Sequence, residues 1–213
     1  MVRFSLFGIP IEIQPWFWVT LAILGRGLEA SSAAAFLYVC IFVIAGAVSI
    51  LVHELGHALT IRAFGAPTRI VLQAFGGYAT YPSGMFGRGK SFVVSLAGPA
   101  VQLVLAGAAW GVWNFVRFPT AYSERLFFYL FVVSLFWALL NLIPVIPLDG
   151  GQMMSATLGP RRHKLALQIS MATAVLGAVV VHFLLGGYLF PIFMLMFAWQ
   201  NHKELRAFRA GGW

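Results

Sequence analysis

The chain has 213 residues, of which 61% are apolar and only 9% are charged. This composition excludes an ordinary soluble domain and indicates a polytopic membrane protein, with room for one membrane-embedded domain over residues 1–213. The net charge of +8 does not indicate nucleic-acid binding, because the basic residues lie in short loops between apolar segments, where membrane topology accounts for them.

The N-terminal residues do not have the pattern of a cleaved secretory signal. Apolar residues alternate between Phe4 and Ile13, which predicts a short strand or an interfacial segment. The apolar segment 16–24 follows Pro15 and is short for a membrane span.

Longer apolar segments follow along the chain. Four have spanning length: residues 33 to about 64, 91–116, 126 to about 146, and 165–185. Segment 188–200 is short and contains Pro191, so it is marginal, as is 16–24. We expect an all-α polytopic protein with about six transmembrane helices.

Residues 64–91 interrupt this pattern. The stretch 70–82 is rich in Gly and aromatic residues, which predicts a strand or a hairpin. Because lipid does not tolerate open strand edges, we expect this small hairpin at the membrane surface or against a protein cavity.

The distribution of basic residues predicts the orientation. If six segments cross, eleven Lys and Arg residues lie on one side, and only Arg26, Arg117 and Arg125 lie on the other. The positive-inside rule then places both termini in the cytoplasm. We expect a protein of a prokaryotic inner membrane, in contact with the lipid bilayer and not with nucleic acid.

The first long apolar segment contains His53-Glu54-Leu55-Gly56-His57. Histidines four residues apart share one helix face, so both can ligate one metal ion while the adjacent glutamate reaches a water on that metal. The alternative is two packed histidines beside a stray acid. Ionisable groups inside a membrane are costly without partners, which favours the metal site.

A catalytic zinc takes three protein ligands and keeps one position open, so one ligand has to be found. Asp149 is the best candidate, because Pro144 and Pro147 break the helix before it and Gly150-Gly151 permits a tight turn after it. Two long spans separate Asp149 from the histidines, and two crossings return the chain to the same face of the membrane. The alternative is an ordinary aspartate at a helix end.

Together these motifs resemble the site-2 protease family of intramembrane zinc metalloproteases. The resemblance extends from the H-E-x-x-H segment through Gly76-Gly77 and Ser-Leu-Ala-Gly-Pro at 95–99 to the N-x-x-P-x-x-P-L-D-G-G run that begins at Asn141. It implies that His53, His57 and Asp149 bind Zn²⁺, that Glu54 is the general base, and that the Gly76-Gly77 hairpin lies near the path of a transmembrane substrate.

Two further polar residues are candidates for substrate binding, beside Gly76 and Gly77. Gln102 stands where relatives commonly carry an asparagine, and it can still donate and accept hydrogen bonds. Asn141 lies in an apolar run, so we expect it to bond a neighbouring helix, the metal shell or a substrate backbone. From this sequence we expect neither a PDZ insertion nor a CBS module, and therefore no regulation by those domains.

The rival interpretation is a metal-binding transporter or channel that passes cations along the same His and Asp residues. It predicts ligands distributed across the membrane, whereas the candidate ligands gather toward one face. The sequence therefore favours an intramembrane endopeptidase.

Overall fold

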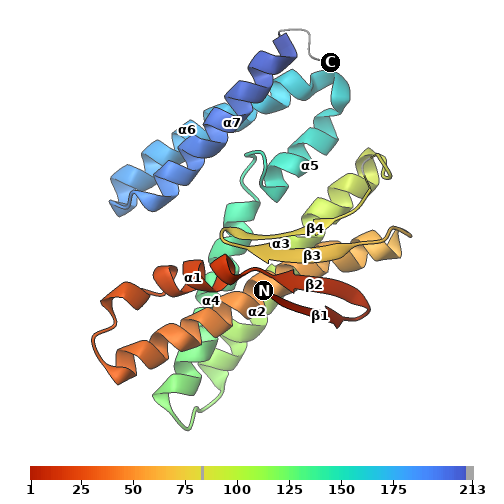
Figure 1. The fold of residues 1–213 in the computed structure, drawn as a ribbon. Helices are drawn as coiled ribbons and strands as arrows, with labels where there is room; N and C mark the ends of the chain where they lie inside the picture. Colours follow the sequence, from red (N-terminus) through yellow and green to blue (C-terminus); the bar gives the residue numbers. More distant parts are fainter. Residues whose placement is uncertain (83, 210–213) are drawn as a thin grey trace. The chain divides into compact units, whose positions relative to one another are not determined.

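The computed structural model describes residues 1–82 and 84–209. Its elements are, in chain order, β1 (Val2–Leu6), β2 (Ile9–Ile13), α1 (Pro15–Leu24), η1 (Gly27–Glu29), α2 (Ala33–Ala63), β3 (Arg69–Gln73), β4 (Gly76–Thr80), α3 (Arg88–Phe115), α4 (Ala121–Asn141), α5 (Asp149–Leu158), η2 (Pro160–Arg162), α6 (His163–Leu185) and α7 (Leu189–Arg209) (Figure 1). These elements form two compact units: residues 1–85 with 97–139, and residues 86–96 with 140–213.

Four helical segments of the described chain are long and apolar enough to cross a bilayer. They are α2, α3, α4 and the segment Pro160–Leu184, which covers α6 except for its last residue. This confirms the polytopic, mostly helical class, but the count of six spans is not confirmed. The 10 residues of α1 extend only about 15 Å as a helix, half of the roughly 30 Å hydrocarbon core.

The N-terminal strands and the predicted hairpin belong to one four-stranded sheet with the order β1-β2-β3-β4. Strands β1 and β2 are antiparallel, as are β3 and β4, whereas β2 pairs with β3 in parallel, with Ile11 opposite Ile70. The sequence predicted both strand segments but not this pairing between them.

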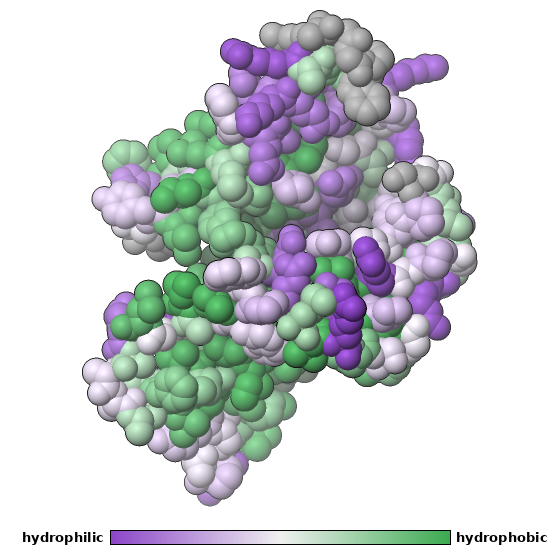
Figure 2. All heavy atoms as spheres, viewed as in Figure 1, coloured by the Kyte–Doolittle hydropathy of each residue, from purple (hydrophilic) through white to green (hydrophobic). Residues whose placement is uncertain are grey.

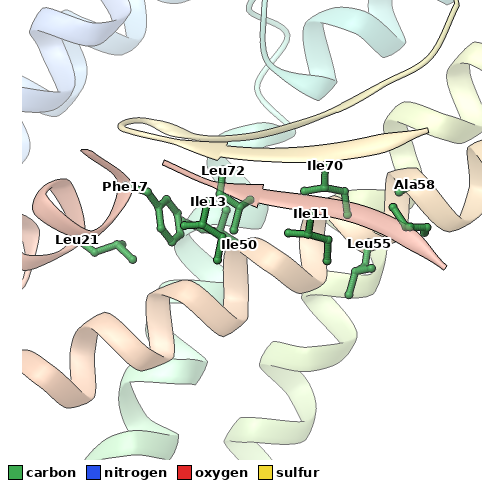
Figure 3. Close-up of a cluster of buried hydrophobic side chains, with 10 residues drawn as sticks. Ile11, Ile13, Phe17, Leu21, Ile50, Leu55, Ala58, Ile70 and Leu72 are labelled. Atoms are coloured by element: carbon green, nitrogen blue, oxygen red, sulfur yellow. The ribbon is translucent and has the colours of Figure 1, made fainter. Parts of the chain in front are cut away.

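The sheet packs on the second half of α2. Alternate residues of β2 and β3 point into a common apolar cluster with residues of α1 and α2 (Figure 3). Its buried members are Ile9, Ile11, Ile13, Phe17, Leu21, Ile50, Leu55, Ala58, Ile70 and Leu72. The period of two in each strand places one face of the sheet against the helix and leaves the other face more exposed. The motif of α2 therefore lies beside the sheet.

Segment 15–32 runs back along α2. Leu21 of α1 packs against Gly46, and Gly25, which follows α1, approaches Phe42. Ser32 then caps α2 by accepting a hydrogen bond from the amide of Ala35. Short α1 and the loop after it together connect the sheet to the start of α2.

The second unit contains the α6–α7 helical hairpin. The two helices pack antiparallel around Ala174, Ala178, Met194 and Ala198. His163 at the start of α6 bonds Glu204 near the end of α7 at 2.7 Å. In Figure 2 the visible face of this hairpin is hydrophobic over most of its length and hydrophilic near the end where α6 begins.

The third long span differs from its predicted limits of 126 to about 146. It begins earlier, at Ala121, because the hydroxyl of Thr120 accepts a hydrogen bond from the amide of Ser123 and caps the helix. It ends at Asn141, before the segment that contains Pro144 and Pro147, which have no amide hydrogen for a helix. Helix α5, which follows, was not predicted.

Candidate metal centre

His53 and His57 converge on one point at the side of α2. Their Nε2 atoms lie 3.1 Å apart, and the side chains are 3% and 8% exposed. Two nitrogen ligands of one tetrahedral zinc, each about 2.0–2.1 Å from the ion, are separated by about 3.3 Å. The spacing of the pair therefore fits two ligands of one zinc ion.

Glycines bring α3 close to these histidines. A Cβ built on Gly98 would lie 2.3 Å from His57 Nε2, and one built on Gly56 would lie 2.6 Å from the carbonyl oxygen of Ala97. No real side chain tolerates either approach. The two glycines therefore permit α2 and α3 to pack closely at the level of the motif, which removes the histidines from lipid and water.

Glu54 lies between the histidines and faces the sheet. It is 3% exposed, and a Cβ built on Gly77 of β4 would lie 2.7 Å from its Cγ. The preceding residue, Gly76, has φ +120°, and a Cβ there would lie 3.1 Å from the ring of Trp137. Both predicted hairpin glycines thus occupy positions that other residues would not fit, and β4 passes directly over the Glu54 carboxyl group.

Gln102 of α3 is fully buried on the other side of His53. Its Oε1 lies 2.9 Å from His53 Nδ1, and its Nε2 lies 2.8 Å from the hydroxyl of Ser49. The structure therefore brings His53, Glu54, His57, Gly77 and Gln102 together in the first compact unit.

Asp149 is placed by the second unit, as the first residue of α5. The preceding loop, residues 142–148, folds tightly onto this first turn: a Cβ on Gly150 would lie 2.2 Å from the carbonyl oxygen of Leu142, and one on Gly151 would lie 2.5 Å from the amide nitrogen of Ile146. Asn141 is the last residue of α4 and is half-buried.

Two buried polar residues hold that loop from α6 and α7. The amide of Ile146 donates to the Ser170 hydroxyl at 2.8 Å, and the Asn201 amide donates to the Ile146 carbonyl at 2.9 Å and to the Ser170 hydroxyl at 2.7 Å. These bonds satisfy backbone groups that an irregular segment would otherwise leave unpaired in an apolar environment. Sequence reasoning missed Ser170 and Asn201, although each is a polar residue in an otherwise apolar run.

The donor set suits zinc. By residue type, the imidazole nitrogens of His53 and His57 with one carboxylate oxygen, for which Asp149 is the predicted source, would leave one position of a tetrahedral zinc ion open. A glutamate follows the first histidine directly. Such a set can hold a hydrolytic metal and a base beside it.

Comparisons with known proteins agree with this chemistry. Residues 116–185 match the model of peptidase family M50. The chain is 35% identical over 161 residues to protein sll0528 of Synechocystis sp., which covers 71% of this chain and 42% of that protein. It is 28% identical over 167 residues to zinc metalloprotease MJ0392 of Methanocaldococcus jannaschii, covering 74% of this chain and 45% of the relative. The chain thus spans less than half the length of these two relatives.

The fold also matches a solved structure. The site-2 protease from Methanocaldococcus jannaschii superposes with a TM-score of 0.68, at 24% identity, over 96% of this chain and 94% of that one. Stage IV sporulation protein FB of Bacillus subtilis is a further relative, 29% identical over 175 residues, which cover 79% of this chain and 56% of that protein. The chain belongs to peptidase family M50, the family of the site-2 proteases.

Proposed function

We propose that this chain is an intramembrane zinc endopeptidase that hydrolyses a peptide bond within or near a transmembrane segment of another protein. One observation carries the proposal: two buried histidine Nε2 atoms, 3.1 Å apart, lie beside a buried glutamate on a helix long and apolar enough to cross a membrane. His53 and His57 would hold a zinc ion there, which when bound would polarise a carbonyl group and lower the pKa of a bound water.

In this mechanism Glu54 is the general base. Its carboxylate takes a proton from the attacking water and passes it to the amine of the leaving peptide. Burial between α2, α3 and the sheet keeps bulk water away from this transfer. His53 and His57 hold the metal, and Asp149 is the proposed third ligand because its carboxylate completes the zinc donor set. Helices α3 and α4, which both have spanning length, return the chain to the same membrane face before Asp149.

We propose that the substrate binds along β4. A transmembrane helix hides its carbonyl groups in hydrogen bonds, so it has to unwind before attack, and an unwound segment needs new backbone partners. Strand β4 is an edge of the sheet and lies against Glu54 at Gly77. Strand addition at this edge would supply those partners beside the general base. Gly76 and Asn141 are proposed to contact the same segment.

The proposed orientation places the motif and both termini on the cytoplasmic side of a prokaryotic inner membrane. The α6–α7 hairpin supports this: because His163 bonds Glu204, α7 ends at the level where α6 begins. If α6 crosses the membrane, α7 returns across it. The basic residues at 161, 162, 164, 203 and 206 then all lie on one side.

The transporter interpretation finds no support in the comparisons. The matching family is a peptidase family, and a relative bears the name of a zinc metalloprotease.

The decisive experiment distinguishes the role of Glu54 as general base from the role of His57 as metal ligand. Glu54→Gln keeps the size of the side chain and removes the basic carboxylate, so zinc should stay near one per chain while cleavage falls about 10²- to 10⁴-fold. His57→Ala, as the matched variant, should lose most of its zinc. The readout is the set of new termini inside transmembrane segments, found by proteomics of membranes that carry either form. Equal cleavage by Glu54→Gln and the unaltered chain would reject the mechanism.

A further inference from the structure

Gln102 connects the histidine motif to two other helices through a chain of buried hydrogen bonds. Its Oε1 lies 2.9 Å from His53 Nδ1, and its Nε2 lies 2.8 Å from Ser49 Oγ and 3.3 Å from the Ser49 carbonyl oxygen. Ser134 of α4 extends the chain by donating to Ser49 Oγ at 2.9 Å. Gln102, Ser49 and Ser134 are all 0% exposed.

The hydrogen-bond partners of Gln102 determine which end of its side-chain amide faces His53. The Ser49 backbone carbonyl can only accept a hydrogen bond, so the amide nitrogen of Gln102 has to face it. The amide oxygen therefore faces His53, and an oxygen of this kind only accepts. It follows that His53 carries its hydrogen on Nδ1.

This assignment determines what His53 offers on its other side. In a neutral imidazole with hydrogen on Nδ1, Nε2 has a lone pair. That nitrogen is the one directed at His57 Nε2, 3.1 Å away. Gln102 thus selects the ring form in which Nε2 can bind a metal, and its hydrogen bond also fixes the angle of the ring.

The hydrogen bonds that join Gln102 to His53 and Ser49 favour a single orientation of the Gln102 amide. Each member is a polar group inside apolar helices, where a lost partner costs more than it does in water. Ser49 of α2 accepts from the Gln102 amide nitrogen, and Ser134 of α4 bonds Ser49 in turn. Rotation of the amide would break its bonds to both His53 and Ser49.

We propose that Gln102 is a positioning residue for His53, held in turn by Ser49 and Ser134. The proposal rests on the proposed function in that His53 is taken as a zinc ligand. It assigns Gln102 a role behind the metal site, because a fully buried amide with both ends engaged by the protein is not placed to contact substrate. Loss of such a partner typically weakens metal binding about 10- to 100-fold.

Two substitutions separate positioning from space filling. Gln102→Met keeps the length of the side chain but removes the acceptor, so zinc affinity, measured by competition with a chelator on the purified protein, should fall about 10- to 100-fold. Gln102→Glu keeps an acceptor for His53 Nδ1 and should hold zinc more tightly than Gln102→Met. A residue that only fills space would give the reverse order, and that order, or equal affinities, would overturn the proposal.

A second measurement is made on the unaltered sequence, and a variant serves only to assign one signal. Nitrogen-15 NMR of labelled, metal-free protein at neutral pH should show the His53 signal with hydrogen on Nδ1, assigned by its absence in His53→Ala. Hydrogen on Nε2 instead would overturn the proposal.

If the proposal of a zinc site at His53 and His57 is itself wrong, the result is different. In that case His57→Ala would hold as much zinc as the unaltered chain. If only the Gln102 proposal fails, His57→Ala is depleted of zinc while Gln102→Met remains loaded.

Discussion

Gly77 lies directly against Glu54, so that a Cβ at this position of β4 would come within 2.7 Å of Glu54 Cγ and 2.9 Å of Cδ. The sheet and the motif helix therefore meet at the side chain proposed as the base. If substrate binds along β4 as proposed, this contact links its binding to catalysis, because a movement of β4 also moves the residues that pack against the Glu54 carboxyl group.

Gly77→Ala should impair cleavage without removing zinc. The added methyl group would also lie 2.7 Å from Leu72 Cδ2, so either β4 or the Glu54 carboxyl group has to shift. A displacement of about 1 Å in a catalytic group can cost about 100-fold in rate. We expect a loss of that order in the rate constant of cleavage, with zinc content unchanged.

Gly87→Ala is the control for this substitution, because a Cβ there meets nothing within 4 Å. It should leave cleavage near the level of the unaltered chain. Equal rates for Gly77→Ala and Gly87→Ala would show that the contact with Glu54 has no catalytic consequence.

Strand addition predicts a difference between the two edges of the sheet. Tyr78 on β4 and Phe4 on β1 are similarly exposed, at 41% and 42%, but only β4 lies beside Glu54. A photo-crosslinking residue at position 78 of the Glu54→Gln variant should capture a transmembrane substrate, whereas one at position 4 should not. Capture at position 4 alone would place the substrate elsewhere.

The bond between Asn201 and Ile146 should stabilise the loop before Asp149. Asn201→Leu leaves the half-buried Ile146 carbonyl without this donor, and loss of such a partner typically costs about 1–3 kcal/mol in the free energy of unfolding. We expect a lower unfolding temperature and weaker zinc retention. The exposed neighbour substitution Gln200→Leu should change neither, and equal effects from both would argue against the loop as the cause.

Local patterns in the sequence predicted the long helices, the hairpin and the H-E-x-x-H motif, because each depends on residues close together in the chain. The parallel pairing of Ile11 with Ile70 could not be predicted in this way, since it joins segments separated by a long helix. Helix α5 was missed because Gly150 and Gly151 in its first turn disfavour a helix. There the folded loop and its contacts outweigh the local preference.

The surroundings of His53 illustrate the same limit. Sequence reasoning identified Gln102 as a polar residue near the site, but its partner Ser49 lies on α2, and Ser134, which bonds Ser49, lies on α4. A lone polar residue in an apolar run indicates that a partner exists, because an unpaired group is costly there. Only the packing of the helices shows which residue that partner is.

The orientation of the chain can be tested with reporter fusions, and the helical hairpin makes the test sharp. Because α6 and α7 are antiparallel and His163 bonds Glu204, a fusion at Gly187 between them should report the outer side if α6 crosses. A fusion after Trp213, which lies outside the described residues, should report the cytoplasm, and one after Phe118 should report the outside. This pattern follows from the eleven basic residues expected on the inner side against three on the outer side. Outer signals from both Gly187 and Trp213 would mean that α7 does not return across the membrane, and the six-crossing topology would then be wrong.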